Sequence, residues 1–240
     1  MNNSIISTVV VISITIIISN LFSFNIVSSF SSQEEEIKIN QQKPFLNNNT
    51  STYLDEFGYL HLYGEVINLS NYPINDILLN ATFYDNENNI LGKYFRNSEI
   101  STLFPNQSSP FEIIFLDTTD SKKVADYDIS LSFNYTKDDN NKLPNLKITE
   151  ITERFDISGF YYINGRIHNM GEKDSSNSTV IATLYDKKGN VIDLTKAITE
   201  PFTIPPNSNA AFSLTVVNKD TSLQLAEIYL SAESVEYVSR

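Results

Sequence analysis

The chain has 240 residues, with 29 acidic and 17 basic side chains and a formal net charge of −12. A surface this acidic repels nucleic acids and anionic lipid headgroups, which argues against both as partners. There is no cysteine, so disulfides and thiolate metal sites are excluded. The length suffices for one large domain or for two of about 100 residues.

The N-terminal segment is apolar and uncharged. Residues 5–24 read IISTVVVISITIIISNLFSF, and the first charged side chain is Glu34. About twenty such residues can span a bilayer as a helix. A signal peptide followed by the small residues Ser28 and Ser29 also accounts for the pattern. We expect residues 1–32 to be a signal peptide or an N-terminal membrane anchor. Either one places the rest of the chain outside the cytoplasm, secreted or anchored to the cell membrane.

The following segment, residues 33–52, is polar and rich in Asn and Gln. It shows little periodicity, so we expect a linker. A tail that binds a partner is the alternative.

A phrase near the middle of the chain recurs 101 residues later: NATFYD at residues 80–85 returns as IATLYD at residues 181–186. The same offset aligns Gly58 with Gly159, Gly64 with Gly165, Asn68 with Asn169, Pro105 with Pro206 and Phe111 with Phe212. We predict two copies of one domain, at 53–136 and 146–240, joined by a polar linker at 137–145. A period this long is typical of independent tandem domains and not of a solenoid.

Within each copy, apolar residues alternate with polar ones. In YLHLYGEVIN, residues 59–68, Leu60, Leu62 and Val66 share one face of a predicted strand. In the repeated phrase we expect Phe83 and Leu184 to point inward, while Thr82, Tyr84, Thr183 and Tyr185 point outward.

The repeated phrase ends in an aspartate, Asp85 or Asp186, followed by NENN or KKGN. A carboxylate here can accept hydrogen bonds from turn amides, with Asn88 or Gly189 in the left-handed position of a hairpin. Each copy then offers about six or seven short strands. The predicted fold class is all-β, with two tandem immunoglobulin-like antiparallel β-sandwiches preceded by an N-terminal apolar helix.

Both copies resemble a known family. The first reads GEVINLSNYPINDILLNATFYDNENN, followed by SPFEI, and the second reads GRIHNMGEKDSSNSTVIATLYDKKGN, followed by IPPNSNAAFSL. These stretches are similar to the FxLYD-type domain of exported and envelope proteins of archaea and bacteria. The resemblance implies an extracytoplasmic β-sandwich module with no assigned catalytic residues.

Residue types that support catalysis are sparse. The two histidines, His61 and His168, fall on the predicted outward phase, so we expect surface side chains and no Ser–His–Asp triad or zinc site. Carboxylate pairs occur at Asp117/Asp120, Asp126/Asp128 and Asp138/Asp139, where we expect solvated charges and not a glycosidase pair. Calcium at KDDNN, residues 137–141, is an open alternative. We expect no enzyme, no cofactor and no metal.

The outward side chains provide the remaining candidates. N-x-S/T sequons in the exported part mark Asn48, Asn49, Asn80, Asn106, Asn134 and Asn177 as possible glycosylation sites. Asn68 also begins a sequon, but it falls on the inward phase and aligns with Asn169, and we interpret both as strand-end turn residues. Tyr63, Tyr84, Tyr162 and Tyr185 form a possible aromatic binding surface.

Three function classes follow from this pattern. We expect a non-catalytic extracytoplasmic envelope protein that binds or spaces a protein partner. A binding module for a glycan or other extracellular polymer is the alternative. A hydrolase or metal-dependent enzyme is the third.

Overall fold

The computed structural model describes residues 44–46, 49–136 and 142–239. The predicted signal peptide or anchor, with its apolar helix, lies outside the described residues. Residues 43–240 group into one compact unit. Within the described ranges, no helix has both the length and the apolar character needed to cross a membrane.

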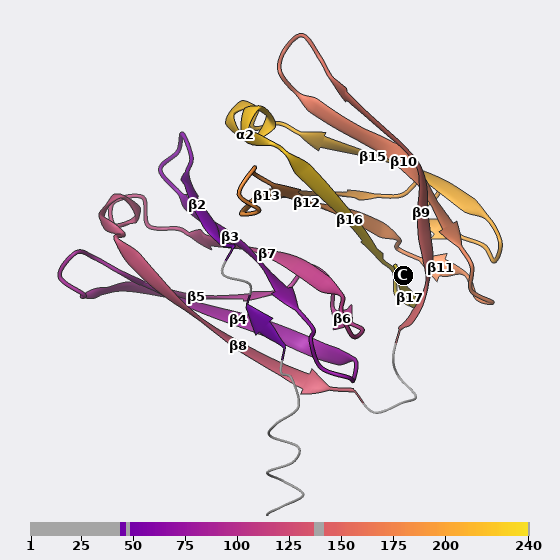
Figure 1. Ribbon diagram of the computed structural model, residues 1–240, viewed down its shortest axis with the longest axis horizontal. Coiled ribbons are helices and arrows are strands. Elements are labelled where there is room, and N and C mark those ends of the chain that lie inside the picture. The colour runs from indigo at the N-terminus through magenta and orange to yellow at the C-terminus, as the bar shows by residue number, and fades with distance from the viewer. Residues whose placement is uncertain (1–43, 47–48, 137–141, 240) are drawn as a thin grey trace, which may run out of the picture. The chain divides into compact units, whose positions relative to one another are not determined.

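The first copy is built from two antiparallel sheets (Figure 1). In one sheet, β3 pairs with β7 on one side and with both β1 and β2 on the other. In the second sheet, β4 lies between β5 and β8 and also pairs with β6. The strands are β1 (Phe45–Leu46), β2 (Ser51–Leu54), β3 (Leu60–Ile67), β4 (Ile74–Tyr84), β5 (Ile90–Asn97), β6 (Thr102–Leu103), β7 (Ser108–Phe115) and β8 (Asp126–Tyr135), with the 3-10 helix η1 (Ser121–Lys123) before β8.

The second copy has one continuous seven-stranded sheet, in the order β13-β12-β16-β17-β9-β10-β15, and the small pair β11-β14. All pairings are antiparallel except that of β17 with β9. Its elements are β9 (Leu143–Phe155), β10 (Tyr161–Asn169), β11 (Ser175–Ser176), β12 (Thr179–Tyr185), β13 (Val191–Ile198), β14 (Thr203–Ile204), β15 (Asn209–Val216), α2 (Lys219–Gln224), β16 (Glu227–Glu233) and β17 (Tyr237–Ser239). The all-β class is confirmed.

The two copies repeat each other in register at the predicted offset. Tyr84 pairs with Ile90 and Tyr185 with Val191, each just after a register shift in the hairpin. Tyr84 and Tyr185 therefore occupy equivalent strand positions, as predicted.

The turns after the repeated phrase are also equivalent. The Asp85 carboxylate accepts hydrogen bonds from the Glu87 and Asn89 amides, and Asp186 does the same for Lys188 and Asn190. Asn88 and Gly189 have φ values of 63° and 81°. Both predictions for this turn are confirmed.

Asn68 and Asn169 are fully buried where β3 and β10 end. The side-chain amide of Asn68 donates to the carbonyls of Tyr72 and Leu103, and that of Asn169 donates to those of Lys173 and Ile204. The interpretation as turn residues is confirmed.

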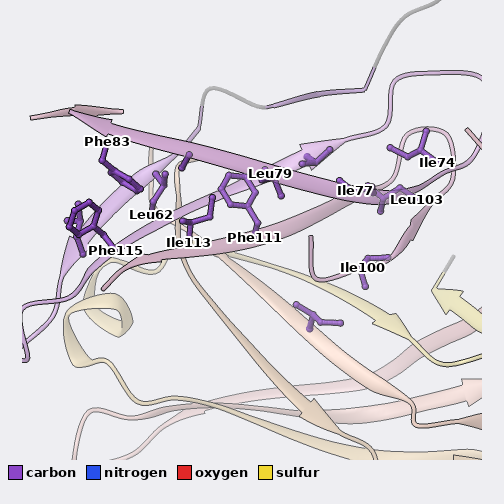
Figure 2. Packing of buried hydrophobic residues seen from close by; sticks show 14 of the residues in the cluster. Leu62, Ile74, Ile77, Leu79, Phe83, Ile100, Leu103, Phe111, Ile113 and Phe115 are labelled. Atoms are coloured by element: carbon purple, nitrogen blue, oxygen red, sulfur yellow. The ribbon is translucent and has the colours of Figure 1, made fainter. Parts of the chain in front are cut away.

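Phe83 and its neighbours fill the core of the first copy (Figure 2). The Phe83 ring on β4 packs edge-on against Phe115 on β7, with ring centroids 5.2 Å apart. Phe83 and Leu184 are both completely buried, as predicted. Ala81, two residues before Phe83 on the same strand, is also completely buried between the two sheets, and it is small enough to let the opposite sheet approach.

Two strands lie where the sequence led us to expect a linker at 33–52. β1 and the start of β2 extend the first sheet along β3, at positions equivalent to β9 in the second copy. Similarly, β9 begins at Leu143, inside the expected linker at 137–145. β1 and β2 are edge strands of the first sheet and are open to water on one side, so they lack the alternation of a central strand. β9 is instead an internal strand, paired with both β10 and β17.

Candidate functional site

The copies are not independent, which corrects the sequence-based expectation. The outer face of β2, β3 and β7 in the first copy packs against β12 and β13 of the second, and we refer to this contact as the junction. The Val191 amide donates to the Asn49 carbonyl at 2.8 Å, and the Ser51 hydroxyl donates to the Val191 carbonyl at 2.5 Å. The side chains at its centre are Asn49, Ser51, Tyr63, Glu65 and Glu112 from the first copy, and Tyr185, Val191 and Asp193 from the second.

Glu65 is the most enclosed acid of the junction, at 5 % exposure. Its carboxylate accepts a 2.6 Å hydrogen bond from the Asn49 side-chain amide and a 2.9 Å bond from the Tyr185 hydroxyl. A buried charge is tolerated only when it is hydrogen-bonded in this way. Burial, followed by the charge of Glu65, raises the pKa of Tyr185 and keeps it a neutral donor.

Tyr63 and Asp193 form the second polar group. The Tyr63 hydroxyl interacts with the carboxylates of Asp193 and Glu112, and burial first, then these two charges, raises the pKa of Tyr63. Burial raises the pKa of Asp193 to about 6, although the Leu194 amide and the Thr221 hydroxyl stabilise its charge.

His61 lies at the edge of the junction between two acids. Its Nδ1 is 2.7 Å from a Glu112 oxygen and its Nε2 is 3.3 Å from an Asp55 oxygen. The hydrogen bond to Glu112 is the largest cause of the raised pKa of His61, and burial opposes it. Burial pushes the pKa of Glu112 upward, but the bonds from His61 and Tyr63 outweigh it, and the net pKa is lowered. The expected surface histidine is thus a partly buried, acid-paired one.

A second set of contacts continues the junction past the sheet ends. Lys196 donates to Glu99 at 2.6 Å, and the Ser101 hydroxyl donates to Glu233 at 2.6 Å. The Gln107 side chain donates to the Ser239 carbonyl at 2.8 Å. Ile181 and Val238 of the second copy belong to the same apolar cluster as Ile100 and Leu103 of the first copy. The copies therefore share apolar packing as well as polar bonds.

Glu99, Lys196 and Glu233 also line a depression of about 620 Å³ beside these contacts. Its charged side chains pair with one another, since Lys142 also bonds Glu233 at 2.8 Å. These groups hold the two copies together.

The four tyrosines expected on one exposed surface are divided by the junction. Tyr63 is only 6 % exposed and half-buried Tyr185 bonds Glu65, so the prediction of a shared aromatic surface is wrong for these two. Tyr84 and Tyr162 remain partly exposed, with their hydroxyls beside Asp128 and Asp156.

The remaining candidates lie apart from one another. His168 bonds the Asn209 side chain at 3.0 Å. Asp117 caps its own loop by accepting from the Thr119 and Asp120 amides. Across the described ranges, no group of three or more His, Asp or Glu side chains is arranged to hold a metal ion. The calcium alternative at 137–141, which includes the pair Asp138/Asp139, lies outside the described residues, while Asp126 and Asp128 are exposed on β8.

The sequon asparagines differ in accessibility. Asn106, Asn134 and Asn177 are exposed, whereas Asn80 is half-buried on β4. Asn49 has its side-chain nitrogen bonded to Glu65, so the atom that a glycan would modify is already engaged. Asn48 lies outside the described residues.

The acids of the junction were missed because each has an ordinary outward strand position. Glu65 and Tyr63 alternate with buried residues as solvent-facing side chains do, and the second copy has Arg166 and Asn164 at the aligned positions. This lack of repetition was the available signal, because a residue that differs between otherwise matching copies marks an environment that differs.

No family model and no curated protein matches the chain. Among solved structures, it is similar to the exo-chitosanase CsxA of Amycolatopsis orientalis, with 9% identity and a TM-score of 0.29 over 79% of this chain and 26% of that one. It is also similar to red sea bream transglutaminase, with 9% identity and a TM-score of 0.26 over 85% of this chain and 31% of that one. A third likeness is to a GH2 β-galacturonidase from Eisenbergiella tayi, with 10% identity and a TM-score of 0.24 over 75% of this chain and 34% of that one. The chain thus spans about a quarter to a third of each neighbour, and likenesses this weak say nothing about its activity.

Proposed function

We propose that the chain is a non-catalytic extracytoplasmic envelope protein, in which two immunoglobulin-like β-sandwiches, joined as one body, bind or space a protein partner. The FxLYD-type resemblance and the apolar segment 5–24 support the location. The observation that carries the proposal is the set of exposed apolar side chains at the hairpin end of each copy.

In the first copy these side chains surround the β2–β3 hairpin. Phe57 at its tip is 71 % exposed, and Leu54, Tyr59 and Leu116 are exposed beside it. The loop after β7 contacts this hairpin, because the Ser121 hydroxyl donates to the Gly58 carbonyl at 2.6 Å.

The second copy repeats the arrangement with different residues. Ile157 at the β9–β10 tip is fully exposed, and Phe155, Val217 and Leu223 are exposed as well. Aliphatic and aromatic side chains exposed together are typical of protein-binding surfaces. The carboxylates of Asp193 and Glu65, which are of the kind that acid–base catalysis would need, are instead enclosed in the junction.

A different observation favours the glycan alternative. Tyr72 and Tyr135 are 51 % and 44 % exposed, with ring centroids 6.3 Å apart. Their rings stand edge to face, at 78°, which gives a sugar one flat surface and not a continuous platform.

The test places a photo-crosslinking residue at Phe57 or Ile157 in the chain expressed in its own cells. Matched controls carry it at Asn86 or Lys187, which are exposed polar positions in the other hairpin of each copy. We expect the tip positions, and not the controls, to crosslink to a defined envelope protein in intact cells. Crosslinks to polysaccharide alone would support the alternative, and no tip-specific crosslink would contradict the proposal. The intact mass of the chain from membranes shows whether residues 1–32 are removed.

A further inference from the structure

The junction joins two unlike faces. The first copy contributes the outer face of β3 with its neighbours, and the second contributes the outer face of β12 and β13. Because the copies are equivalent, each face has a counterpart that the junction does not use. These are the outer face of β4 in the first copy and the outer face of β10 in the second. A contact between unlike faces does not close on itself, so it can be repeated from molecule to molecule.

The free face of β10 contains a depression. The depression has a volume of about 520 Å³ and is lined by residues that include Asn164, Gly165, Arg166, Ala211 and Ser213. At the offset of 101, Gly165 and Arg166 correspond to Gly64 and Glu65. Glu65 is where the Tyr185 hydroxyl binds in the junction. The β10 face thus has a depression at the position aligned with the residue that binds Tyr185.

The free face of β4 carries the matching side chain. Tyr84 is the equivalent of Tyr185 and is partly exposed beside Asp128. Leu78 and Phe95, at 36 % and 64 % exposure, take the places of Thr179 and Lys196 of the junction. This face therefore offers apolar area as well as the tyrosine.

The charges of the two free faces are complementary. In a chain with a net charge of −12, the β10 face and the strands beside it present Lys147, Arg154 and Arg166 against Glu150 and Glu200. The β4 face presents Asp126 and Asp128 from β8 against Lys93 from β5.

The junction also predicts which charges meet. Tyr229 lies close enough to Glu65 for the carboxylate to act on its hydroxyl. The equivalent of Tyr229 in the first copy is Asp128, and the equivalent of Glu65 in the second copy is Arg166. Where the junction has Tyr229 beside Glu65, the contact between the two free faces has an Asp128–Arg166 ion pair. Arg166 is available for it, because its present partner Glu150 is 69 % exposed and an exposed pair exchanges at little cost.

We propose that this chain assembles head to tail with further copies of itself, the β4 face of one molecule packing on the β10 face of the next as β12 packs on β3 within one molecule. The assembly is open-ended, with Tyr84 entering the depression at Gly165 and Asp128 pairing with Arg166. Asn80 lies in the middle of the β4 face, so a glycan on Asn80 would block this contact.

Sedimentation velocity of residues 43–240 over a concentration series tests the proposal, since this unit contains both hydrophobic cores. We expect a progression of masses beyond the dimer that weakens with salt. Arg166→Glu and Asp128→Arg each place like charges in the contact and should lower the association constant about tenfold or more. Lys122→Glu, which makes the same charge change as Arg166→Glu at an exposed site on η1, should associate as the unmodified unit does.

Mixing the two defective variants is the decisive arm. Each supplies the intact face that the other lacks, so an equimolar mixture should regain association. A unit that stays monomeric at every concentration, or stops at a closed dimer, overturns the proposal. It is also overturned if Arg166→Glu associates normally or if the mixture remains monomeric.

Discussion

The hydroxyl of Tyr185 donates a 2.9 Å hydrogen bond to the carboxylate of Glu65, which lies 120 residues earlier in the chain. This bond connects the repeated phrase of the second copy to β3 of the first copy. The outward face of the phrase is therefore a binding face, although its inward face serves the core. Four predictions follow from the junction and the cores around it.

Tyr185→Phe should destabilise residues 43–240, because it removes a donor from a carboxylate that is 5 % exposed. A hydrogen bond to a buried charged group contributes about 1.5–3 kcal/mol. Tyr84→Phe is the matched control, since Tyr84 has the same strand position but faces Asp128 near solvent, and it should change stability little. Urea denaturation of both variants measures the difference. Equal effects would show that the Tyr185–Glu65 bond contributes nothing specific.

Phe83→Ala should cost about 3–5 kcal/mol, because the ring is completely buried against Phe115. Phe95→Ala removes the same atoms from a side chain that is 64 % exposed and should cost far less. Since the copies share the junction, we expect Phe83→Ala to lower the unfolding transition of both copies together. Fluorescence probes in each copy report this. Two separate transitions, with the second copy unchanged, would argue against coupling.

Thr183→Ala should destabilise more than Thr82→Ala, although the two threonines are equivalent in the repeat. Thr183 is 1 % exposed, while Thr82 is on the uncovered face of β4. Truncating Thr183 leaves the junction less well filled, which should lower the free energy of unfolding by about 1 kcal/mol. Thermal unfolding of the pair resolves a difference of this size, and identical melting temperatures would contradict the burial of the β12 face.

Stability should fall as the pH rises from about 4 to above neutrality. The pKa of Asp193 is raised from its ordinary 3.8 to about 6, so the unfolded chain loses this proton first and the folded state becomes less favoured over that interval. The raised pKa of His61 acts in the same sense: its contribution is complete below 6.5 and is lost as the pH rises through the higher folded value. Asp55 and Glu112, with lowered pKa values, act oppositely and only at more acidic pH.

Asp193→Asn tests the origin of this pH dependence. The amide keeps the shape of the side chain without its charge. It should reduce the total fall in unfolding free energy between pH 4 and pH 6 by up to about 3 kcal/mol. His61→Gln should remove the part above 6.5. An unchanged pH profile in Asp193→Asn would place the titrating group elsewhere.

The sequence predicted what depends on local alternation and on the repeat. Phe83 and Leu184 are inward because every second residue of a strand faces the same side, and Asp85 and Asp186 cap turns because short carboxylates reach nearby amides. The periodicity indicates which side chains point away from the core of their own copy, but not which surface covers those side chains in the folded chain. Tyr63 and Thr183 have the correct phase and are nevertheless buried, because the covering surface comes from the other copy.

The alternation of apolar and polar residues does not predict the edge strands, for a related reason. β1 consists of Phe45 and Leu46 alone, and β2 follows an Asn-rich stretch. Their place is fixed by the free edge of β3, which is a tertiary property. Likewise β17 is three residues long, and its parallel pairing with β9 joins positions that no local signal connects.

Val238 lies on β17, the final strand of the second copy, and it packs in the apolar cluster of the first copy. During synthesis, the first copy therefore lacks part of its apolar packing until β17 has left the ribosome. Contacts of such long sequence separation slow folding, because the intervening chain must be ordered before they form. The first copy, although it is made first, therefore completes its apolar packing only after the second copy has been synthesised.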